Sequence, residues 1–366
     1  MDPRGVSTGA QFIYNSRMNN ELFTASQDDL AQLMKSWGFP GFRAKQVYEW
    51  LHKHHVESLD AMTNVPQALR EKLAERFPEE NTAIVEKRIS KDGSRKYLLQ
   101  LADGRIVETV GLPAQKNEDD ETTGRLSVCV SSQVGCPMEC AFCATGQEGF
   151  TRNLTATEIV DQVVSVQKDF DQRVSNVVVM GQGEPFLNYG EVLSALRILN
   201  DSTDLNIGAR HITLSTCGIV EGINKLAQEP EQFTLAVSLH SAIQLTRDAL
   251  MPRVQNQPLS QLKKALKNYV AQTNRRVSLE YLLLKDINDD DEHLQALIDF
   301  CKGLLVHVNL LPMNAVKGSV FQPSPQKTVH HWMKTLNEHG IETTMRVSRG
   351  SDIEGACGQL KQTALK

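Results

Sequence analysis

The chain has 366 residues and a formal net charge of −5, with seven cysteines. This length suits one large α/β domain together with a smaller one. The negative charge argues against a globally basic nucleic-acid binder, so any RNA contact must come from local patches. Since no apolar run approaches the length of a membrane span and the N-terminus lacks a signal-peptide pattern, we expect a cytoplasmic protein without membrane contact. An odd number of cysteines in such a chain favours metal or redox use over a disulfide framework.

The N-terminal part predicts a small helical module. Residues 1–22 are polar and aperiodic, and we expect them to be flexible. Apolar residues then recur at helical spacing through residues 23–80, with breaks around Gly38, Pro40 and Pro66. This segment is predicted to be a helical accessory domain that contacts RNA.

Residues 81–124 predict a β-hairpin region and a linker. Short alternating strands are separated by Asp92-Gly93 and Asp103-Gly104, which are typical hairpin turns. The region carries the basic residues Lys87, Arg88, Lys91, Arg95 and Lys96. These side chains could hold phosphates or could form a solvated charged face, and the sequence favours neither. The acidic stretch 114–124 is predicted to be a flexible loop.

Residues 125–348 alternate between apolar β-type runs and helical patterns. We predict strands at Leu126 to Val130, Asn176 to Met180, His211 to Ser215, Phe233 to Leu239, Arg276 to Leu284 and Val306 to Leu311. The helices between them begin near Thr157, Tyr189, Val220, Leu259 and Asp290, and a further helix begins near Ser324. Six strands each followed by a helix indicate an α/β fold with a curved parallel sheet, open or closed into a barrel. Ligands in such folds bind at the carboxyl ends of the strands.

Three cysteines follow the first of these strands closely. Cys136, Cys140 and Cys143 have the spacing C-x3-C-x2-C, which lets three thiolates converge on one soft metal centre. An iron–sulfur cube held by three cysteines keeps one iron open for a substrate. The alternatives are a zinc site that uses a remote fourth ligand and inert buried cysteines. Cys217, Cys301 and Cys357 lie far along the chain from this motif.

Polar motifs stand at the ends of the later predicted strands. Gly181-Gln-Gly183-Glu184-Pro185 is not a dinucleotide fingerprint, because Phe186 stands where a third glycine is needed. Glycines at a strand end let the backbone approach a ligand, and Glu184 could accept hydrogen bonds from an ammonium group. Equivalent positions are taken by Ser215, Ser238, Leu239, His240 and Asn314. Together they predict a ring of ligand-binding residues.

These motifs resemble the radical S-adenosylmethionine (SAM) RNA adenine C2-methyltransferases, the dual-specificity family that modifies 23S ribosomal RNA and transfer RNA. The resemblance covers about residues 25–362 and includes Val107-Glu108-Thr109, the stretch from Cys129 to Cys143, Gly183-Glu184-Pro185 and the segment Arg349 to Leu360. It implies a partial (β/α)6 radical-SAM barrel over residues 125–348 and a C-terminal loop over 349–366 that carries a methylated cysteine.

The resemblance also implies a role for each motif residue. Cys136, Cys140 and Cys143 would bind a [4Fe-4S] cluster, and Gly183, Glu184, Ser215, Ser238, Leu239, His240 and Asn314 would line the SAM site. Cys357 would carry a methyl group from a first SAM, and a second SAM would be cleaved to a radical that activates this group. The activated carbon would bond to C2 of adenine. Glu108 would then act as the general base, and Cys129 would resolve the RNA adduct.

The implied partners are 23S ribosomal RNA, transfer RNA and an external electron donor such as flavodoxin or ferredoxin, and the chain is expected to be a monomer. The nearest alternative is a C8-methylating relative, but Pro185 favours C2 methylation. A radical-SAM enzyme with a small-molecule substrate is disfavoured by the pair Cys129 and Cys357. A third alternative, from a different class of protein, is a ribosome-assembly factor that uses the cluster only for structure. Cleavage of SAM by the protein would exclude this alternative. The resemblance gives Cys217 no role.

Overall fold

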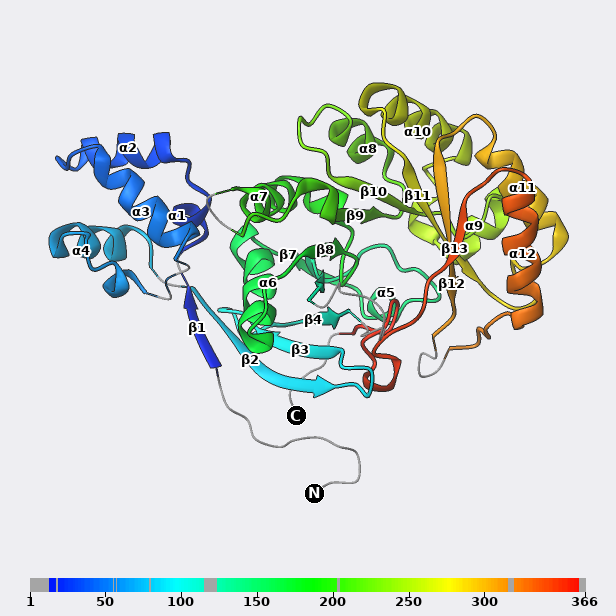
Figure 1. The fold of residues 1–366 in the computed structure, drawn as a ribbon, viewed down its shortest axis with the longest axis horizontal. Coiled ribbons are helices and arrows are strands. Elements are labelled where there is room, and N and C mark those ends of the chain that lie inside the picture. The colour runs from blue at the N-terminus through cyan, green and yellow to red at the C-terminus, as the bar shows by residue number, and fades with distance from the viewer. Residues whose placement is uncertain are drawn as a thin grey trace, which may run out of the picture.

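The computed structural model describes residues 13–17, 19–54, 56, 58–78, 80–114, 124–202, 205–314 and 319–361. A helical module lies at one end of the molecule, and a large α/β domain forms the remainder (Figure 1). No helix in these ranges combines the length and apolar character that a membrane span requires. The predicted acidic loop at 114–124 lies outside the described residues except for its two ends.

The large domain is built on one continuous sheet. Its strands lie in the order β1-β2-β3-β4-β5-β8-β9-β10-β11-β12-β13. They are β1 (Ile13–Arg17), β2 (Glu80–Ile89), β3 (Arg95–Gln100), β4 (Ile106–Pro113), β5 (Leu126–Val130), β8 (Asn176–Val179), β9 (Ile212–Thr216), β10 (Thr234–Ser238), β11 (Val277–Leu283), β12 (Val306–Pro312) and β13 (Thr343–Met345). Strands β1 to β5 pair antiparallel, and β5 to β13 pair parallel.

The parallel half of the sheet confirms the predicted partial barrel. All six predicted strands are present, and β13 is a seventh strand that the sequence analysis missed. Among the described residues β13 pairs with β12 and not with β5, so the barrel is open. Buried residues alternate with less buried ones along β8 and β9, and less buried residues of these strands line the cavity at the carboxyl end of the sheet.

Helices connect the parallel strands and lie along the outside of the curve (Figure 1). They are α6 (Ala156–Phe170), α7 (Tyr189–Asn200), α8 (Val220–Leu226), α10 (Leu259–Thr273), α11 (Asp291–Cys301) and α12 (Gln326–Glu338). Helix α6 begins with a capping box at Thr155. Its hydroxyl accepts from the Glu158 N–H, while the Glu158 carboxylate accepts from the Thr155 N–H. A further helix, α9 (Gln244–Leu250), was not predicted.

The helical module confirms the predicted helices within residues 23–80. It contains α1 (Asn20–Thr24), α2 (Gln27–Ser36), α3 (Phe42–His52) and α4 (Gln67–Arg76). Helices α2, α3 and α4 each bury two apolar side chains in one shared core. These are Leu30 and Met34, Val47 and Leu51, and Leu69 and Leu73. The Tyr48 hydroxyl donates to Asp201 over 3.0 Å at the end of α7. This contact joins the module to the large domain.

The region before β5 has two features that the sequence did not predict. Residues 13–17 form β1, which pairs with β2 between Arg17↔Glu80 and Ile13↔Ile84. The partner strand is more than sixty residues away, so local composition gave no sign of it. Residues 81–113 are also not a separate unit, because the predicted hairpins β2-β3 and β3-β4 continue into the main sheet through the pairing of β4 with β5.

The C-terminal segment returns across the first hairpin. The Ser90 hydroxyl donates to Asp352 over 2.6 Å, and the Gly350 N–H donates to Asp92 over 2.9 Å. These bonds fix the short helical turn η5 (Ser351–Ile353) against the turn between β2 and β3. Cys357 follows four residues later and is exposed. The hairpin therefore positions the segment that carries this cysteine.

Candidate active site

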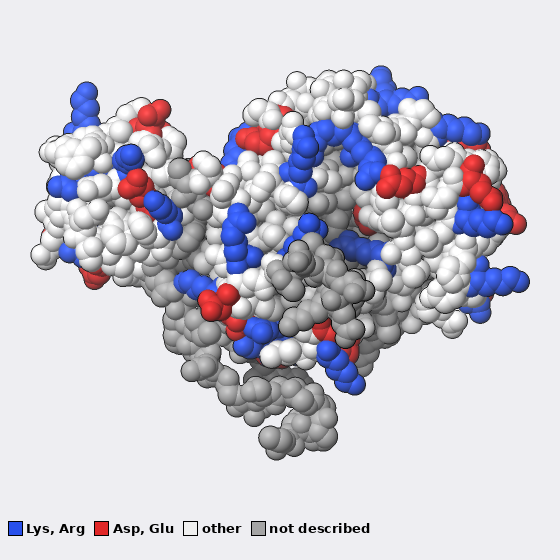
Figure 2. All heavy atoms as spheres, in the orientation of Figure 1, with Lys and Arg blue, Asp and Glu red and all other residues white. Residues whose placement is uncertain are grey.

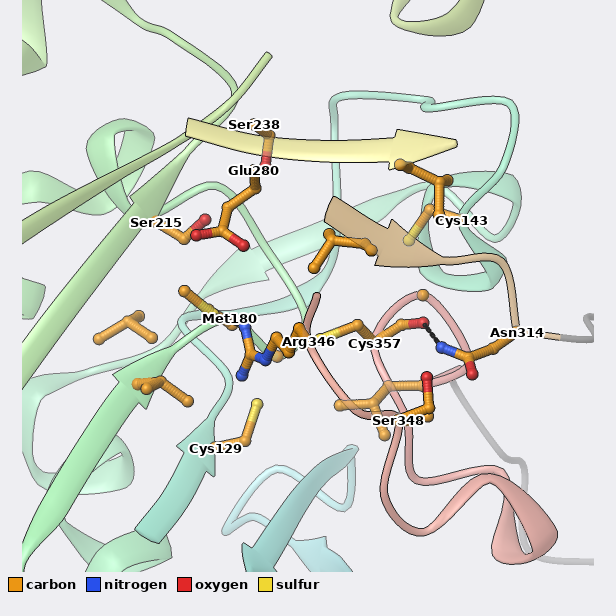
Figure 3. A pocket seen from close by; sticks show the side chains of 18 of the residues that line it. Cys129, Cys143, Met180, Ser215, Ser238, Glu280, Asn314, Arg346, Ser348 and Cys357 are labelled. Carbon is orange, nitrogen blue, oxygen red and sulfur yellow. Dashed lines mark hydrogen bonds between the residues drawn. The ribbon is translucent and has the colours of Figure 1, made fainter. Parts of the chain in front are cut away.

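A cavity of about 540 Å³ lies at the carboxyl ends of the parallel strands. Eleven of the predicted site residues line it: Cys129, Cys136, Cys140, Cys143, Gly183, Glu184, Ser215, Ser238, His240, Asn314 and Cys357. They come from widely separated parts of the chain, and the curved sheet brings them together, as Figure 3 shows for Cys129, Cys143, Ser215, Ser238, Asn314 and Cys357. Glu108 and Leu239 do not line the cavity.

The loop that carries three of these cysteines is fixed by backbone contacts. The Cys136 N–H donates to the Gly149 carbonyl over 2.8 Å, where the hairpin of β6 (Gln133–Gly135) and β7 (Phe150–Asn153) closes. A Cβ atom at Gly135 would lie 2.1 Å from the Gly149 oxygen, so only glycine fits there. Cys143 precedes the short helix α5 (Ala144–Gln147), and its N–H donates to the Cys140 carbonyl over 3.0 Å.

The loop offers a purely sulfur donor set inside a largely buried site. Burial raises the pKa of the Cys136 thiol to about 12, and burial also raises the pKa of Cys143. A metal that binds here must displace these protons, and soft iron centres do so because thiolate is their preferred ligand. Among the described residues the three thiols are not gathered into a metal-binding arrangement, but they line one cavity and supply the ligand type of an iron–sulfur cluster with an open position.

The second motif, which runs from Gly181 to Pro185, lines the cavity with Gly181, Gly183 and Glu184. Gly183 has φ +106, and a Cβ there would lie 2.6 Å from the Ser132 hydroxyl. Glu184 is 1% exposed, and its carboxylate accepts from the N–H groups of Phe186 at 3.0 Å and Cys217 at 2.6 Å. Burial raises the pKa of Glu184. Each carboxylate oxygen already holds one backbone donor, so an ammonium group would be an additional donor to it.

His240 has a fixed and neutral ring. It takes a left-handed backbone conformation with φ +54, and its Nδ1 accepts from the Leu282 N–H over 3.1 Å. Its ring meets the Phe142 ring edge-on, with 4.7 Å between centroids. Burial, with a smaller effect of Arg247, lowers the pKa of His240 to about 3. The neighbouring Leu239 is completely buried, and its backbone N–H donates to the Glu280 carbonyl over 3.0 Å.

The two remote cysteines face the same cavity. Cys129 lies on β5 and is buried, and burial raises the pKa of its thiol to about 12. Cys357 lies in the C-terminal segment, where its carbonyl accepts from the Asn314 side chain over 3.1 Å. The Gly358 carbonyl accepts from the Ala144 N–H over 2.8 Å, which joins this segment to the cluster loop.

Arg346 is a cavity residue that the sequence analysis missed. Figure 3 shows its guanidinium beside Met180, with Cys129 and Cys357 nearby. The Nη1 atom lies 3.2 Å from the Met180 sulfur, and Cys357 raises the pKa of Arg346 more than any other group. Within the described ranges, Arg346 forms no ion pair with a carboxylate. Its signal in the sequence was its place directly after β13, a strand that was itself not predicted.

Glu108 lies beneath the C-terminal segment. Its side chain is 1% exposed and forms an ion pair with Lys96, with 2.9 Å between Nζ and Oε1. Its Oε2 accepts from the Lys361 N–H over 3.0 Å. Leu360, the residue before Lys361, lines the cavity. The C-terminal segment thus separates Glu108 from the cavity.

Four of the five basic residues of the hairpin form ion pairs, and the fifth, Lys91, is exposed. Lys96 is completely buried against Glu108. Lys87 and Arg95 both pair with Asp169 at 2.7 Å. Arg88 pairs with Glu86 at 2.5 Å. These cations hold the hairpin to α6 and to the C-terminal segment, so a direct role in RNA binding is not supported for them.

The fold and this cavity define a radical SAM methyltransferase. Residues 130–298 match the Radical SAM superfamily, and residues 20–78 match the ribosomal RNA large subunit methyltransferase N-terminal domain. A crystal structure of a radical SAM methyltransferase from Sphaerobacter thermophilus superposes with a TM-score of 0.85 at 39% identity, covering 93% of this chain and 99% of that one. Enzymes of this class use a [4Fe-4S] cluster and SAM, which the three thiols and the cavity fit.

Curated relatives narrow the class to one family. The probable dual-specificity RNA methyltransferase RlmN of Clostridium novyi is 43% identical over 340 residues, which cover 93% of this chain and 97% of that protein. The protein of the same name from Acaryochloris marina is 45% identical over 344 residues, covering 94% and 95%. The chain belongs to the RlmN family of radical SAM RNA methyltransferases.

Proposed function

We propose that this protein methylates C2 of an adenine in 23S ribosomal RNA, and of the adenine 3′ to the anticodon in transfer RNA, through a methyl group carried on Cys357. The observation that supports this most is a single cavity lined by the three-cysteine loop and by both remote cysteines, Cys129 and Cys357. A methyltransferase that moved the SAM methyl group directly would need neither remote thiol.

Cys357 suits the role of methyl carrier. It is exposed, so a SAM methyl group and an RNA base can both reach it. The bonds from Asn314 and Ala144 to the carbonyls of Cys357 and Gly358 hold the backbone that follows this side chain. Displacement by the Cys357 sulfur on a first SAM leaves an S-methyl group that faces the cavity.

C2 of adenine has no lone pair, so it requires a radical route. Cys136, Cys140 and Cys143 would hold a [4Fe-4S] cluster, which would supply the electron for reductive cleavage of a second SAM to a 5′-deoxyadenosyl radical. One hydrogen atom passes from the S-methyl group of Cys357 to the 5′-deoxyadenosyl radical, and the resulting carbon radical adds to C2. The adduct then gives up one electron, which the oxidised cluster would accept. RNA and Cys357 are then joined by a thioether bridge.

Glu108 and Cys129 resolve this bridge. Glu108 takes the C2 proton. Cys129 gives up its thiol proton to solvent as its sulfur attacks the Cys357 sulfur. An S–S bond forms, and the carbon–sulfur bond breaks toward carbon, which takes a proton from solvent to complete the methyl group. An external donor such as flavodoxin or ferredoxin supplies the electron for SAM cleavage, and a reductant reopens the disulfide. Because Leu360 and Lys361 lie between Glu108 and the cavity, the C-terminal segment must shift before Glu108 can act.

The RNA must reach this cavity with its target base unstacked. On the face seen in Figure 2, Lys and Arg side chains are spread over the helical module and the large domain and are interspersed with Asp and Glu. No strongly cationic field stands out on this face, in keeping with the net charge of −5. Recognition therefore depends on RNA shape as well as charge, with the helical module as the proposed contact.

The experiment that tests the function is nucleoside mass spectrometry of 23S ribosomal RNA and transfer RNA from a strain that lacks this protein. We expect 2-methyladenosine to disappear from one ribosomal position and from the transfer RNA position 3′ to the anticodon, and to return with the wild-type gene. Unchanged 2-methyladenosine in both RNAs would contradict the proposal.

A further inference from the structure

A fourth thiol stands beside the cysteine loop. The Cys217 sulfur lies 4.0 Å from the Cys140 sulfur, although the two residues are 77 positions apart in the sequence. Both side chains line the cavity, together with Cys136 and Cys143. The cavity wall therefore presents four thiols at this point, and the fourth comes from the end of β9 and not from the loop.

The backbone of Cys217 is held firmly on both sides. Its N–H donates to the buried Glu184 carboxylate, and its carbonyl accepts from the completely buried Arg247 over 2.6 Å. The chain then turns at Gly218, which has φ +96, and the Thr216 hydroxyl accepts from the Gly218 N–H over 3.0 Å. The Cys217 sulfur contacts the Cys140 sulfur, and rotation about the Cα–Cβ bond of Cys217 would move it to another position in the cavity.

The neighbours of Cys217 place it between the cluster thiols and the residues proposed to bind SAM. On one side its sulfur contacts Cys140. On the other side its N–H binds Glu184, and Ser215 of the same strand lines the cavity two residues earlier. SAM would bind the fourth iron of a cube held by three cysteines, so that iron would lie toward the residues proposed to bind SAM. Cys217 borders this region, and thiolate is a ligand that iron prefers.

We propose that Cys217 is a fourth thiol ligand of this site, which binds the open iron when SAM is absent and is displaced by SAM. The proposal rests on the cluster assigned under the proposed function. Ligation by Cys217 closes the cluster while the enzyme waits for SAM, and SAM must compete with it for the iron. The apparent affinity for SAM is then lowered by the fraction of enzyme in which the iron is open.

The test compares wild type with Cys217→Ala and Cys217→Ser, and uses Cys301→Ala as the matched control. Cys301 is buried on α11 and does not line the active-site cavity. Each protein is reconstituted anaerobically with iron and sulfide, its iron is counted, and the reduced cluster is studied by electron paramagnetic resonance with and without SAM. SAM affinity is measured on the same samples.

We expect equal iron content in all four proteins, because three cysteines remain. Without SAM, both Cys217 variants should give a spectrum different from wild type and from Cys301→Ala, and with SAM all spectra should coincide. If the open iron is exposed in about a tenth of wild-type molecules, Cys217→Ala should bind SAM about tenfold more tightly. Identical spectra without SAM, or unchanged or weaker SAM binding in Cys217→Ala, would overturn the proposal.

A second pair of variants tests directly whether Cys217 can serve as a cluster ligand. Cys143→Ala should retain most of its iron because Cys136, Cys140 and Cys217 remain, whereas Cys143→Ala/Cys217→Ala should lose it. Equal iron loss in the single and double variants would count against Cys217 as a ligand. A wild-type protein without iron would overturn the cluster assignment and both proposals, whereas normal RNA methylation with an unaltered Cys217→Ala spectrum would overturn this one alone.

Discussion

Lys96 and Glu108 form an ion pair inside the protein, with 2.9 Å between Nζ and Oε1 and side chains that are 0% and 1% exposed. Strand pairing sets Lys96 opposite Val110 and Leu98 opposite Glu108, so the two charged residues are diagonal neighbours on one face of β3 and β4. The Lys96 ammonium also donates to the Glu354 carbonyl over 3.2 Å. Lys96 thus connects the proposed general base to the segment that carries Cys357.

This pair predicts a clear pattern of stabilities. Lys96→Met or Glu108→Gln alone leaves one buried charge without its partner, which should lower the free energy of unfolding by about 3–5 kcal/mol. The double variant should recover much of this loss because both charges are gone. Urea denaturation of the metal-free proteins measures it. Lys87→Met is the control, because Lys87 is 38% exposed in its pair with Asp169 and should cost under about 1 kcal/mol. A double variant less stable than either single variant would refute the coupling.

Glu108→Gln also predicts a specific block in the reaction. The variant keeps the side-chain shape but has no base for the C2 proton, so Cys357 should be methylated and SAM cleaved while the RNA adduct accumulates. Mass spectrometry of the Cys357 peptide and a denaturing gel with labelled RNA provide the two readouts. Turnover at the wild-type rate would assign the base to another residue.

The two remote cysteines should fail in opposite ways. Cys129→Ala should still accept a methyl group on Cys357 and attack RNA, and the enzyme should remain attached to its RNA because no thiol can break the bridge. Cys357→Ala should form no adduct, and Cys129→Ala/Cys357→Ala should match it, since the two residues act in sequence on one pathway. If neither single variant forms an adduct while both keep the fold and the cluster, the assigned order is incorrect.

His240 predicts a loss of stability at acidic pH. Its folded-state pKa of about 3 lies below the ordinary value of 6.5. The stabilising contribution of the neutral ring is therefore complete above pH 6.5 and declines as the pH falls toward 3, by up to ~1.4 kcal/mol per pH unit. His240→Asn keeps an acceptor for the Leu282 N–H and tolerates the positive φ. The unfolding free energy of this variant should fall less steeply than that of wild type between pH 6.5 and 4.5. Parallel curves for the two proteins would show that His240 does not titrate on unfolding.

Much of the large domain could be predicted from sequence because its signals are local. Continuous apolar runs predicted the six parallel strands, and apolar residues at helical spacing predicted the helices between them. Polar motifs stand at the ends of these strands, so the sequence predicted that Ser215, Ser238 and Asn314 lie at one site. All three line the cavity. The parallel order of the strands placed them at the same edge.

The remaining features depend on contacts between distant segments. Strand β1 pairs with the outer edge of β2, which lies more than sixty residues away, and the five residues 13–17 alone give no sign of this pairing. The proximity of Cys217 to Cys140 arises only when the sheet curves and brings the end of β9 to the loop. The sequence did not predict that Lys96 is buried, because its partner Glu108 lies on the next strand. The burial of this pair also depends on the C-terminal segment that covers it.

The central claim is that the methyl group travels through Cys357 to C2 of adenine, and a deuterium label tests it most directly. Purified enzyme, first stripped of its unlabelled Cys357 methyl group, is given SAM with a CD3 methyl group and an RNA substrate, and the nucleosides are analysed by mass spectrometry. We predict 2-methyladenosine that carries two deuterium atoms, because one is removed when the S-methyl group is activated and a proton from solvent replaces it, and we predict one deuterium in 5′-deoxyadenosine. A product that carries three deuterium atoms, or one methylated at C8, would contradict the account.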